Sequence, residues 1–390
     1  GLEKRPKLAF RRADGSSFPS WSRTSLSSII EPYSEKVYGE HKYEVLTSSR
    51  EGLQRQVDHF GSEQRHDTDG YNVIPFGYCT YRNRSDDGRF AFNINTISSN
   101  AIVSKFYPVF RFTNANSLFM SEFLNSSSRA KKKLSVLAVG TSQVVLSFEA
   151  LKAADFDLPC KDEQDKIASF FECLNRRIEY QRTLVDALKK YKRGLLMHYF
   201  SDDKTQLWTQ CSVSQIGKVI TGSTPPTNDR SNYDGDLLFC APGDVGEQKY
   251  ISSTEKRVSP KGFALGRPLP PNSVIVTCIG LIGKLGIAKT SMITNQQINA
   301  LVVSEGFDHE FIYYAFENFF PEYRSKVSMQ TLPILSKSEF EKLMIKVPDL
   351  DVQHKISSHL AAMDRRIEHT QQELNALIEH RRGIMQQLFI

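Results

Sequence analysis

The chain repeats one segment without a gap, and this internal repeat constrains its fold more than any other feature. Residues 158–200 align on residues 347–389 at one constant offset, that from Pro159 to Pro348. Chance does not produce such a match, so the chain consists of two copies of one plan. The identical positions are Pro159, Asp162, Gln164, Lys166, Ile167, Ser169, Arg176, Arg177, Ile178, Glu179, Ala187, Leu188, Arg193, Gly194 and Phe200, repeated as Pro348, Asp351, Gln353, Lys355, Ile356, Ser358, Arg365, Arg366, Ile367, Glu368, Ala376, Leu377, Arg382, Gly383 and Phe389.

The repeat extends more sparsely towards the N-terminus of each copy. Leu146-Ser147 matches Leu335-Ser336 at the same offset. Each copy is therefore predicted to be a globular region followed by a long helix. Further upstream, an opening motif of Trp21, Leu26, Ser27 and Ile29 is echoed by Trp208, Val213, Ser214 and Ile216.

The repeated segments carry the pattern of two paired helices. Their apolar residues step by alternating fours and threes, which is a heptad seam rather than the broader stripe of a helix on a globular core. Each helix is expected to run for about 38 residues, or ~57 Å at 1.5 Å per residue. Polar residues interrupt both seams at the same two places, and such residues typically fix register and partner orientation. The seams are Ile167, Phe171, Leu174, Ile178, Gln181, Val185, Leu188, Lys192, Leu195 and Tyr199, and Ile356, Leu360, Met363, Ile367, Thr370, Leu374, Leu377, Arg381, Ile384 and Leu388.

The outward faces of the two helices are repeated as well. Asp162 and Asp351 lie near the predicted helix starts and suit capping or dipole-stabilising roles. Two copies of one outward face could bind two copies of one partner around a pseudo-twofold axis. A simpler interpretation is that the helices pair only to hold the protein together. The candidate partner-docking residues are Arg176, Arg177, Glu179, Arg365, Arg366 and Glu368.

The globular regions share their two ends but align poorly in their middles. Residues 71–81 and 273–279 are rich in β-branched and aromatic residues, with Gly, Pro and Asn punctuation around them, and this composition predicts curved, mostly antiparallel sheet. Short helices are expected over 117–133 and 311–320. Two regions with the same ends but different middles are suited to present two different binding surfaces to one asymmetric ligand.

Composition and charge exclude some classes of protein. The formal charge of +6 fits a polyanionic partner, although many proteins without one are as basic. Residues 1–15 have no long apolar core, so no signal peptide or anchor is expected there. The most apolar run, 274–288, is broken by glycines and Lys284 and cannot supply ~20 apolar residues for a membrane helix. The sequence therefore predicts a soluble, cytoplasmic protein.

No motif predicts a metal, a cofactor or a catalytic centre. Without a CxxC or Cys/His cluster, the cysteines are interpreted as buried thiols in a reducing compartment. His354 and His359 fit a helix surface better than a ligand pair. The run from Gly280 to Lys284 lacks P-loop spacing, so a hairpin turn is expected there. The Pro-Pro pairs lack the flanking residues of an amino-methyltransferase motif, and no nuclease carboxylate cluster stands out. The cysteines are Cys79, Cys160, Cys173, Cys211, Cys240 and Cys278.

The ordered set of motifs, present twice, resembles the type I restriction-modification DNA specificity-subunit family across nearly the whole chain. The resemblance is carried by the helix pattern of Gln, Lys-Ile, Arg-Arg-Ile-Glu and a basic-Gly segment ending in Phe, together with the Trp openings. Residues 100–104, 279–287 and 294–298 also resemble family segments. The first globular region lacks a clear counterpart of the Gly-Lys-x-Gly segment within 279–287, so contacts are not transferred between the two regions.

The resemblance implies an α+β fold in which two target-recognition domains, mostly antiparallel β with flanking helices, are separated by an antiparallel coiled coil. The expected boundaries are 1–157 and 201–346 for the recognition domains, and 158–200 and 347–390 for the helices. The resemblance also implies a non-catalytic subunit without cofactors, which binds double-stranded DNA and docks two methyltransferase subunits. Restriction subunits would join this core. Each recognition domain would read half of an asymmetric bipartite target, and the helices would set the spacer between the halves.

The candidate DNA-reading residues are polar and basic side chains on loops. Arg suits guanine and Asn or Gln suits adenine in the major groove, whereas Lys more often neutralises phosphate. For any one of them, a solvated surface position is the simpler interpretation. The candidates are Ser48, Ser49, Arg50, Arg82, Asn83 and Arg84 in the first region, and Asn228, Arg230, Lys249, Lys284, Asn295, Gln296 and Gln297 in the second.

Two other functions remain open at this point. A coiled-coil adaptor whose globular regions bind protein predicts no salt-dependent affinity for DNA. A DNA-modifying enzyme predicts activity from the isolated chain. A specificity subunit predicts weak DNA binding alone and tight, specific binding when methyltransferase subunits are present.

Overall fold

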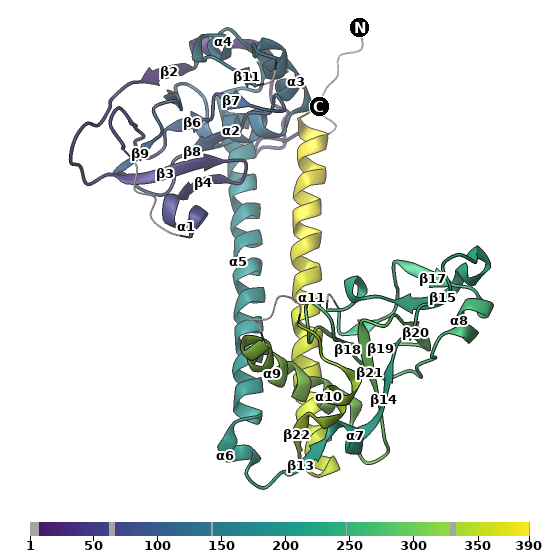
Figure 1. The fold of residues 1–390 in the computed structure, drawn as a ribbon. Coiled ribbons are helices and arrows are strands. Elements are labelled where there is room, and N and C mark those ends of the chain that lie inside the picture. Colours follow the sequence, from purple (N-terminus) through teal and green to yellow (C-terminus); the bar gives the residue numbers. More distant parts are fainter. Residues whose placement is uncertain (1–7, 62–66, 142, 247, 328–332, 390) are drawn as a thin grey trace. The chain divides into compact units, whose positions relative to one another are not determined.

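The computed structural model describes residues 8–61, 67–141, 143–246, 248–327 and 333–389. Residues 1–7, part of the polar N-terminal stretch, lie outside this range. The chain divides into two compact units: the first combines Gly1–Arg182 with Glu373–Ile390, and the second is Thr183–Gln372. Each unit therefore contains one globular region and one end of each long helix, α5 (Lys161–Tyr199) and α11 (Leu350–Leu388) (Figure 1).

Two four-stranded sheets form the frame of the first unit. One sheet contains β2 (Ile30–Tyr33), β10 (Val109–Phe112), β6 (Cys79–Tyr81) and β8 (Phe92–Ile94), all antiparallel to their neighbours. The other contains β4 (Gly52–Arg55), β3 (Glu44–Ser49), β9 (Ala101–Val103) and β5 (Asn72–Val73), and only the β3–β9 pair is parallel. Two short pairs join β1 (Ser22–Ser25) to β12 (Asp155–Leu158) and β7 (Arg84–Ser85) to β11 (Val144–Val145). The helical elements are η1 (Leu26–Ser28), α1 (Gln56–Phe60), α2 (Ser117–Ser126), α3 (Ser128–Leu137) and α4 (Phe148–Lys152).

A five-stranded sheet forms the frame of the second unit. It contains β14 (Gly217–Thr221), β21 (Ile298–Val303), β18 (Val274–Thr277), β19 (Leu285–Ala288) and β16 (Tyr250–Ile251), and only the β16–β19 pair is parallel. A second sheet contains β17 (Lys256–Val258), β15 (Tyr233–Cys240) and β20 (Met292–Thr294), and β13 (Thr209–Ser212) pairs with β22 (Met344–Val347). The helical elements are α6 (Asp202–Thr205), α7 (Val213–Ile216), η2 (Arg230–Asn232), η3 (Pro242–Asp244), α8 (Pro260–Leu265), α9 (His309–Val327) and α10 (Lys337–Lys342).

The same repeated phenylalanine completes the core of each unit. In the first unit Phe389, just after α11, has its ring 5.8 Å from Phe119 and 5.6 Å from Phe123, both on α2. In the second unit Phe200, just after α5, lies 5.5 Å from Phe311 on α9. Burying several aromatic rings together is a large apolar contribution to folding. Each globular region therefore packs on the end of one long helix as well as on the start of the other.

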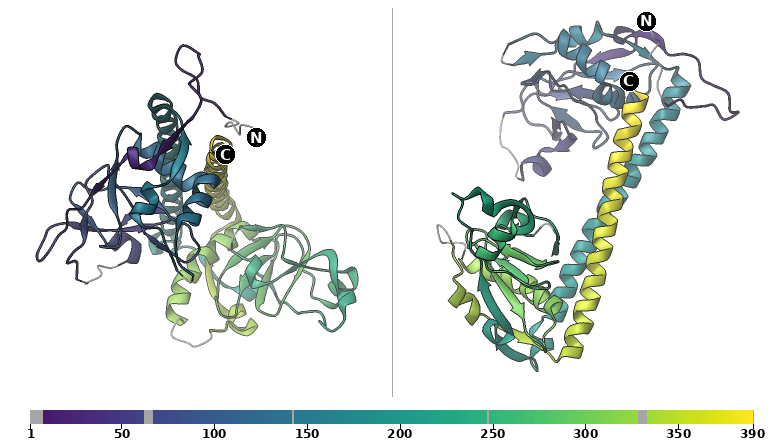
Figure 2. Two further views of the ribbon diagram at one scale, coloured as in Figure 1. Left: turned by 90° about the horizontal axis from the view of Figure 1, so that it is seen from above. Right: turned by 90° about the vertical axis from the view of Figure 1, so that its right-hand side faces the viewer.

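The two long helices pair in opposite directions within each unit, which confirms the predicted antiparallel coiled coil. In the first unit Gln181 Nε2 donates to Glu373 Oε2 at 2.7 Å, and in the second Tyr199 Oη lies 2.5 Å from His359 Nδ1. Each helix spans 39 residues, close to the expected length, and every predicted seam position is buried or half-buried. Figure 2 shows the helices side by side. Of the polar seam residues, Thr370 bonds back to its own helix, since its Oγ1 donates to the Arg366 oxygen at 2.7 Å.

The sparse upstream repeats are structurally equivalent as well. The strands after Trp21 and Trp208 each pair with the strand that leads into a long helix, as β1–β12 and β13–β22. Leu146 and Leu335 are both fully buried. Ser147 caps α4, and its repeat Ser336 caps α10. The two copies therefore share a frame that extends well beyond the helices.

Several local predictions change in detail. The helical stretch predicted over 117–133 is two helices, because Ser127 adopts an extended backbone and caps α3 by accepting from the Ala130 nitrogen. Residues 311–320 lie inside the longer α9, and β18 and β19 confirm the hairpin that contains Lys284. The cysteines are not all buried: Cys173 is exposed on α5, because it lies off the seam, and Cys160 and Cys211 are half-buried.

The described part of the chain contains neither a cluster of metal ligands nor a membrane-spanning helix. No group of three or more His, Cys, Asp or Glu side chains there could hold a metal ion. His354 and His359 are both exposed on α11, as expected. Among the same residues, no helix combines the length and apolar character needed to cross a membrane.

Candidate nucleic-acid interface

Four arginines of the first unit surround a small pocket of about 110 Å³. Strands β3 and β4 form a two-residue hairpin, because Ser49 pairs with Gly52, and the tip carries Arg50. Asn93 Nδ2 on β8 donates to Ser48 Oγ and to the backbone oxygen of Ser49, both at 2.8 Å, and so holds the hairpin on the sheet. We call the arginines of this pocket the arginine cluster; the lining residues are Ser48, Ser49, Arg50, Arg82, Arg84, Ser85, Asp86, Arg89 and Ala91.

Only part of the positive charge in the arginine cluster is neutralised. Asp87 accepts from Arg50 at 2.6 Å and from Ser85 at 2.9 Å, and lies 3.8 Å from Arg89. The Ser85 hydroxyl, and to a smaller extent the Arg50 guanidinium, hold the pKa of Asp87 below its ordinary value. With Asp86 as the other carboxylate, the four arginines keep an excess of positive charge. Such a surface attracts phosphates and presents guanidinium groups to bases.

The other predicted readers of the first unit differ in orientation. Arg82 is exposed, and no ion pair involving it occurs within the described ranges. The guanidinium of Arg84 lies 5.3 Å from the centre of the exposed Phe106 ring, which restricts its motion. Asn83 is a less suitable reader, because its Oδ1 is buried and its backbone oxygen accepts from the Leu146 nitrogen at 2.9 Å.

Three amide side chains of the second unit lie on the turn between β20 and β21, and we call Asn295, Gln296 and Gln297 the amide cluster. Asn295 Oδ1 accepts from the Gln297 backbone nitrogen at 3.0 Å, and Asn295 Nδ2 donates to Gln297 Oε1 at 3.2 Å. Gln296 is exposed, and its Oε1 accepts from Thr224 Oγ1 at 2.7 Å. The turn is thus held in place while part of its amide surface stays accessible to a ligand.

The loop after β14 passes very close to this turn. A Cβ on Gly222 would lie 2.1 Å from the backbone oxygen of Asn295, well inside any real contact. The Ser223 nitrogen donates to the Thr294 oxygen at 2.8 Å and fixes the approach. Glycine is therefore required at this position for steric reasons.

The remaining candidates of the second unit are more scattered. Lys284 ends the β18–β19 hairpin loop, and the start of that loop is tied to the amide cluster, because the Cys278 nitrogen donates to the Gln297 oxygen at 2.8 Å. Asn228 is exposed on the loop that continues from Thr224, and Arg230 is exposed at the start of η2, which follows this loop. No hydrogen bond or ion pair within the described ranges joins these two residues to the amide cluster.

Lys249 is placed unlike the other candidates. Its side chain is 11% exposed, and its Nζ lies 3.0 Å from Glu310 Oε2 and 2.8 Å from Tyr314 Oη. The same ammonium lies 4.4 Å from the centre of the Tyr314 ring. A cation enclosed by a carboxylate and an aromatic face is already satisfied. Lys249 is therefore better explained as part of the interior of the second unit.

A half-buried polar contact between both helices and the globular region recurs in each unit. In the second unit Lys192 Nζ lies 2.7 Å from Asp364 and 2.8 Å from Glu317 on α9. Burial lowers the pKa of Lys192, but Glu317 and Asp364 outweigh it and raise the pKa above its ordinary value. Burial raises the pKa of the Glu317 carboxyl group, and the nearby Lys192 ammonium offsets only part of this rise. We call this arrangement the lysine clamp.

The first unit contains the counterpart of the lysine clamp. Arg381 Nε donates to Asn175 Oδ1 at 2.6 Å, and Arg381 Nη2 lies 2.5 Å from Glu122 on α2. Arg381 is the repeat of Lys192, and Asn175 is the repeat of Asp364. The polar seam residues were identified from the sequence, but their partners were missed, because Glu122 and Glu317 lie in the regions that do not align.

A repeated glutamine also attaches each globular region to a helix. The side chains of Gln164 and Gln353 donate to the oxygens of Pro159 and Pro348, each at 2.9 Å. Their Oε1 atoms accept from the backbone nitrogens of Asn116 and Asp308, both at 2.9 Å, just before α2 and α9. We call this the glutamine clip, and it explains why this glutamine is identical in the two copies.

The family model for the type I restriction modification DNA specificity domain matches residues 31–190 and 206–380, most of the chain. This chain belongs to that family. Each matched stretch contains most of one globular region and most of one long helix, so the family's domain is present twice, in agreement with the internal repeat.

Individual relatives agree with this assignment. A specificity subunit of the type I restriction enzyme MjaIX from Methanocaldococcus jannaschii is 30% identical over 178 residues, which are 44% of this chain. That stretch is 41% of the relative, so the chain spans less than half the length of the curated relative it matches. The solved S subunit of a type I restriction-modification system from M. genitalium has a TM-score of 0.63 at 16% identity and covers 99% of both chains. A chain from a study of complex assembly and conformational transition of the type I system has a TM-score of 0.58 at 16% identity, covering 96% of this chain and 98% of that one. At these identities the solved structures show a shared fold.

The candidate docking residues of this family member lie on the outer helix faces. Arg176, Arg177 and Glu179 are exposed on α5, and their repeats on α11 are exposed as well. Glu179 Oε2 accepts from Arg182 at 2.8 Å, a contact along the helix surface. These residues are therefore accessible to a partner. The repeats are Arg365, Arg366 and Glu368.

Proposed function

We propose that this chain is the DNA sequence-recognition subunit of a type I restriction-modification complex, and that it acts in the cytoplasm without catalysing a reaction itself. Residues 1–157 and 201–346 serve as its recognition domains, and residues 158–200 and 347–390 as its spacer helices. One observation carries the proposal: two units with the same frame present different reading chemistry, an arginine cluster in one and an amide cluster in the other.

The two clusters favour different bases. Guanidinium groups form paired hydrogen bonds with the O6 and N7 atoms of guanine, whereas amides pair with the N6 and N7 atoms of adenine. We therefore propose that the arginine cluster reads a half-site containing guanine and that the amide cluster reads one containing adenine. The two half-sites then differ, and the bipartite target is asymmetric.

The helices provide the assembly surface in this proposal. The exposed faces with Arg176 and Arg365 occur once per copy and suit two methyltransferase subunits, to which restriction subunits bind in turn. The lysine clamp and its arginine counterpart hold each recognition domain on the helices. The helix pair would then set the number of unread base pairs between the half-sites.

Co-expression with the neighbouring methyltransferase gene tests the proposal. Native mass spectrometry should give two methyltransferases per chain, and methylome sequencing should give one new asymmetric, bipartite motif. The variant Arg82→Ala should lower the sequence specificity in one half-site of the motif. Its matched control, Arg382→Ala on the exposed surface of α11, should leave the motif unchanged. A stable lone chain that changes no methylation would instead favour a coiled-coil adaptor.

A further inference from the structure

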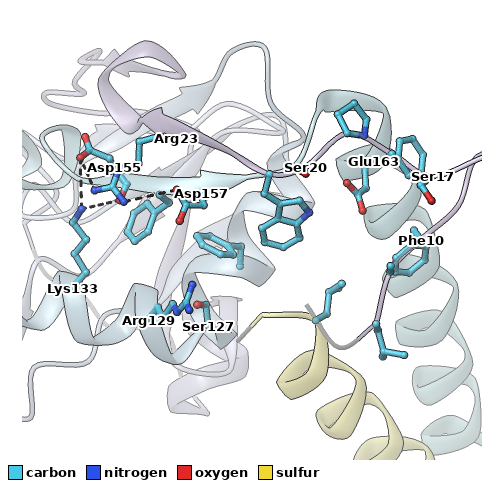
Figure 3. Close-up of a pocket in the computed structure, with 18 residues that line it drawn as sticks. Phe10, Ser17, Ser20, Arg23, Ser127, Arg129, Lys133, Asp155, Asp157 and Glu163 are labelled. Atoms are coloured by element: carbon cyan, nitrogen blue, oxygen red, sulfur yellow. Dashed lines mark hydrogen bonds and ion pairs between the residues drawn. The ribbon is translucent and has the colours of Figure 1, made fainter. Parts of the chain in front are cut away.

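A pocket of about 740 Å³ lies in the first unit, where the residues before β1 pass over the start of α5 (Figure 3). The rings of Phe10, Trp21 and Phe123 line it. Figure 3 shows Glu163 of α5 and Arg129 of α3 on different sides of this pocket. The pocket is separate from the arginine cluster, with which it shares no lining residue.

Glu163 is the unusual member of this pocket. It is only 5% exposed, and its Oε2 has no hydrogen-bond partner among the described residues. Burial raises the pKa of its carboxyl group, and the Trp21 indole offsets part of this rise. A buried polar atom without a partner is costly, and each such atom in a native protein requires an explanation.

The second copy shows that the fold does not need this carboxylate. The repeat of Glu163 is Val352, which packs against the hydrophobic core of the second unit. The start of a long helix can therefore carry an apolar residue at this position. A glutamate whose burial costs stability, where a valine serves the same frame, points to a role other than folding.

The other carboxylates of the pocket already have partners. Asp155 Oδ2 accepts from Arg23 at 3.0 Å, and its backbone oxygen accepts from Lys133 at 2.8 Å. Asp157 lies 3.9 Å from Arg23. Arg129 is exposed, and no ion pair involving it occurs within the described ranges. Glu163 and Arg129 are thus the two charges of the pocket that a ligand can pair.

We propose that this pocket binds a lysine or arginine side chain of a docked methyltransferase subunit, with Glu163 as the carboxylate that receives it. The inference rests on the proposed function, which brings that subunit to α5 and α11. Aromatic rings beside the carboxylate favour a cation, and the volume admits a side chain with its neighbouring residues. Arg129 pairs with an acidic residue of the same segment.

The decisive variant is Glu163→Val, which copies the residue of the second repeat. The dissociation constant of the complex with the methyltransferase should rise at least about 30-fold, the lower end for removing one partner of a buried charge pair. The thermal unfolding temperature of the chain should stay the same or rise, because a buried carboxylate with one oxygen that lacks a partner is replaced by an apolar side chain. A purely structural glutamate would give the opposite result, a lower unfolding temperature with unchanged affinity.

Asp157→Asn is the matched control, because it alters a carboxylate of the same pocket that already has a partner. It should change the affinity less than about 3-fold, as expected for an exposed ion pair. An equal loss of affinity in Asp157→Asn and Glu163→Val would show a general effect of charge and overturn the assignment to Glu163.

A photo-crosslink identifies directly which segment occupies the pocket. The exposed Ser17, labelled near Glu163 in Figure 3, is replaced by p-benzoylphenylalanine in the assembled complex. The expected product joins it to a methyltransferase peptide that contains lysine or arginine, and Glu163→Val should remove this product. Crosslinks within this chain alone, in a complex that forms and methylates DNA normally, would overturn the inference and leave the proposed function intact. Failure of the wild-type complex to form would overturn both.

Discussion

The ammonium group of Lys192 on α5 lies 2.7 Å from the carboxylate of Asp364 on α11. The repeats of these residues make the corresponding contact in the first unit, where Arg381 Nε donates to Asn175 Oδ1 at 2.6 Å. The cation comes from the end of one helix and its partner from the start of the other in both cases. The duplication has therefore preserved a polar contact at a seam that is otherwise mostly apolar, while the residues that form it have changed.

Removing Lys192 should destabilise the second unit strongly. Lys192→Met removes the nearest cation of the half-buried Glu317 and Asp364, while Asp364 keeps the Tyr314 hydroxyl and the more distant Lys249, 4.0 Å away. We expect a loss of about 2 kcal/mol in the free energy of unfolding, less than for a fully buried pair. Urea unfolding at pH 7 measures it, with Arg193→Met on the exposed face of the same helix as control. Equal midpoints for the two variants would contradict the prediction.

The contribution of Lys192 should persist across neutral pH. Glu317 and Asp364 raise its pKa above the ordinary value of 10.5, so the folded state binds this proton more tightly than the unfolded state. The stabilisation is then fully present below pH 10.5 and is lost only as the pH rises through the higher pKa of the folded state. Lys192→Met also removes a cation that lowers the pKa of Glu317, so the comparison is made above the acidic range in which a carboxyl group titrates. The difference in unfolding free energy between wild type and Lys192→Met should therefore stay constant from pH 7 to 9. A marked change of this difference over that range would contradict the assignment.

Gly222→Ala should disable the second recognition domain selectively. The added Cβ would lie 2.1 Å from the backbone oxygen of Asn295, so the loop after β14 and the turn of the amide cluster must separate. In the methyltransferase complex we expect at least about a tenfold loss of sequence discrimination in one half-site, which corresponds to about 1.4 kcal/mol. Methylome sequencing measures it. Gly194→Ala on α5, where a Cβ meets nothing within 4 Å, is the control and should leave the motif unchanged.

Asp229 should titrate at unusually low pH. Lys261 first and then Ser231 lower its pKa to about 2. Because the folded-state pKa lies below the ordinary value of 3.8, the contacts favour folding above that pH, and their effect is lost as the pH falls towards 2. Carbon-detected NMR should place the midpoint near 2 and move it towards 3.8 in Lys261→Ala. An unchanged midpoint in that variant would show that Lys261 is not the cause.

The sequence predicts the long helices and the elements that the two copies share, because these features follow from the spacing of residues close together in the chain. Heptad spacing identified both helices and every seam position, and the gapless repeat predicted the equivalence of Gln164 with Gln353. The glycine-rich run from Gly280 to Lys284 also predicted the hairpin that contains Lys284. These features depend on residues a few positions apart, so the chain itself displays them.

The candidate site was less predictable because it depends on which loops meet. The composition of its loop made Lys249 resemble a DNA reader, but Glu310 and Tyr314 enclose its ammonium, and no local pattern shows that they are near. Arg89 was missed, although it lines the same pocket as Arg82 and Arg84. The sequence does contain a signal for it, since Asp87 and Arg89 closely follow the predicted Arg82-Asn83-Arg84 stretch in the chain.

Each unit combines the beginning of one long helix with the end of the other, and this arrangement has a consequence for synthesis. A ribosome releases the first globular region long before it reaches Phe389, the residue that packs against Phe119 and Phe123. Domains usually fold in the order in which they are made. Here the first region to be made waits longest for its missing packing partner, whereas the second unit, Thr183–Gln372, is contiguous and can close first. The order of completion is thus the reverse of the order of translation.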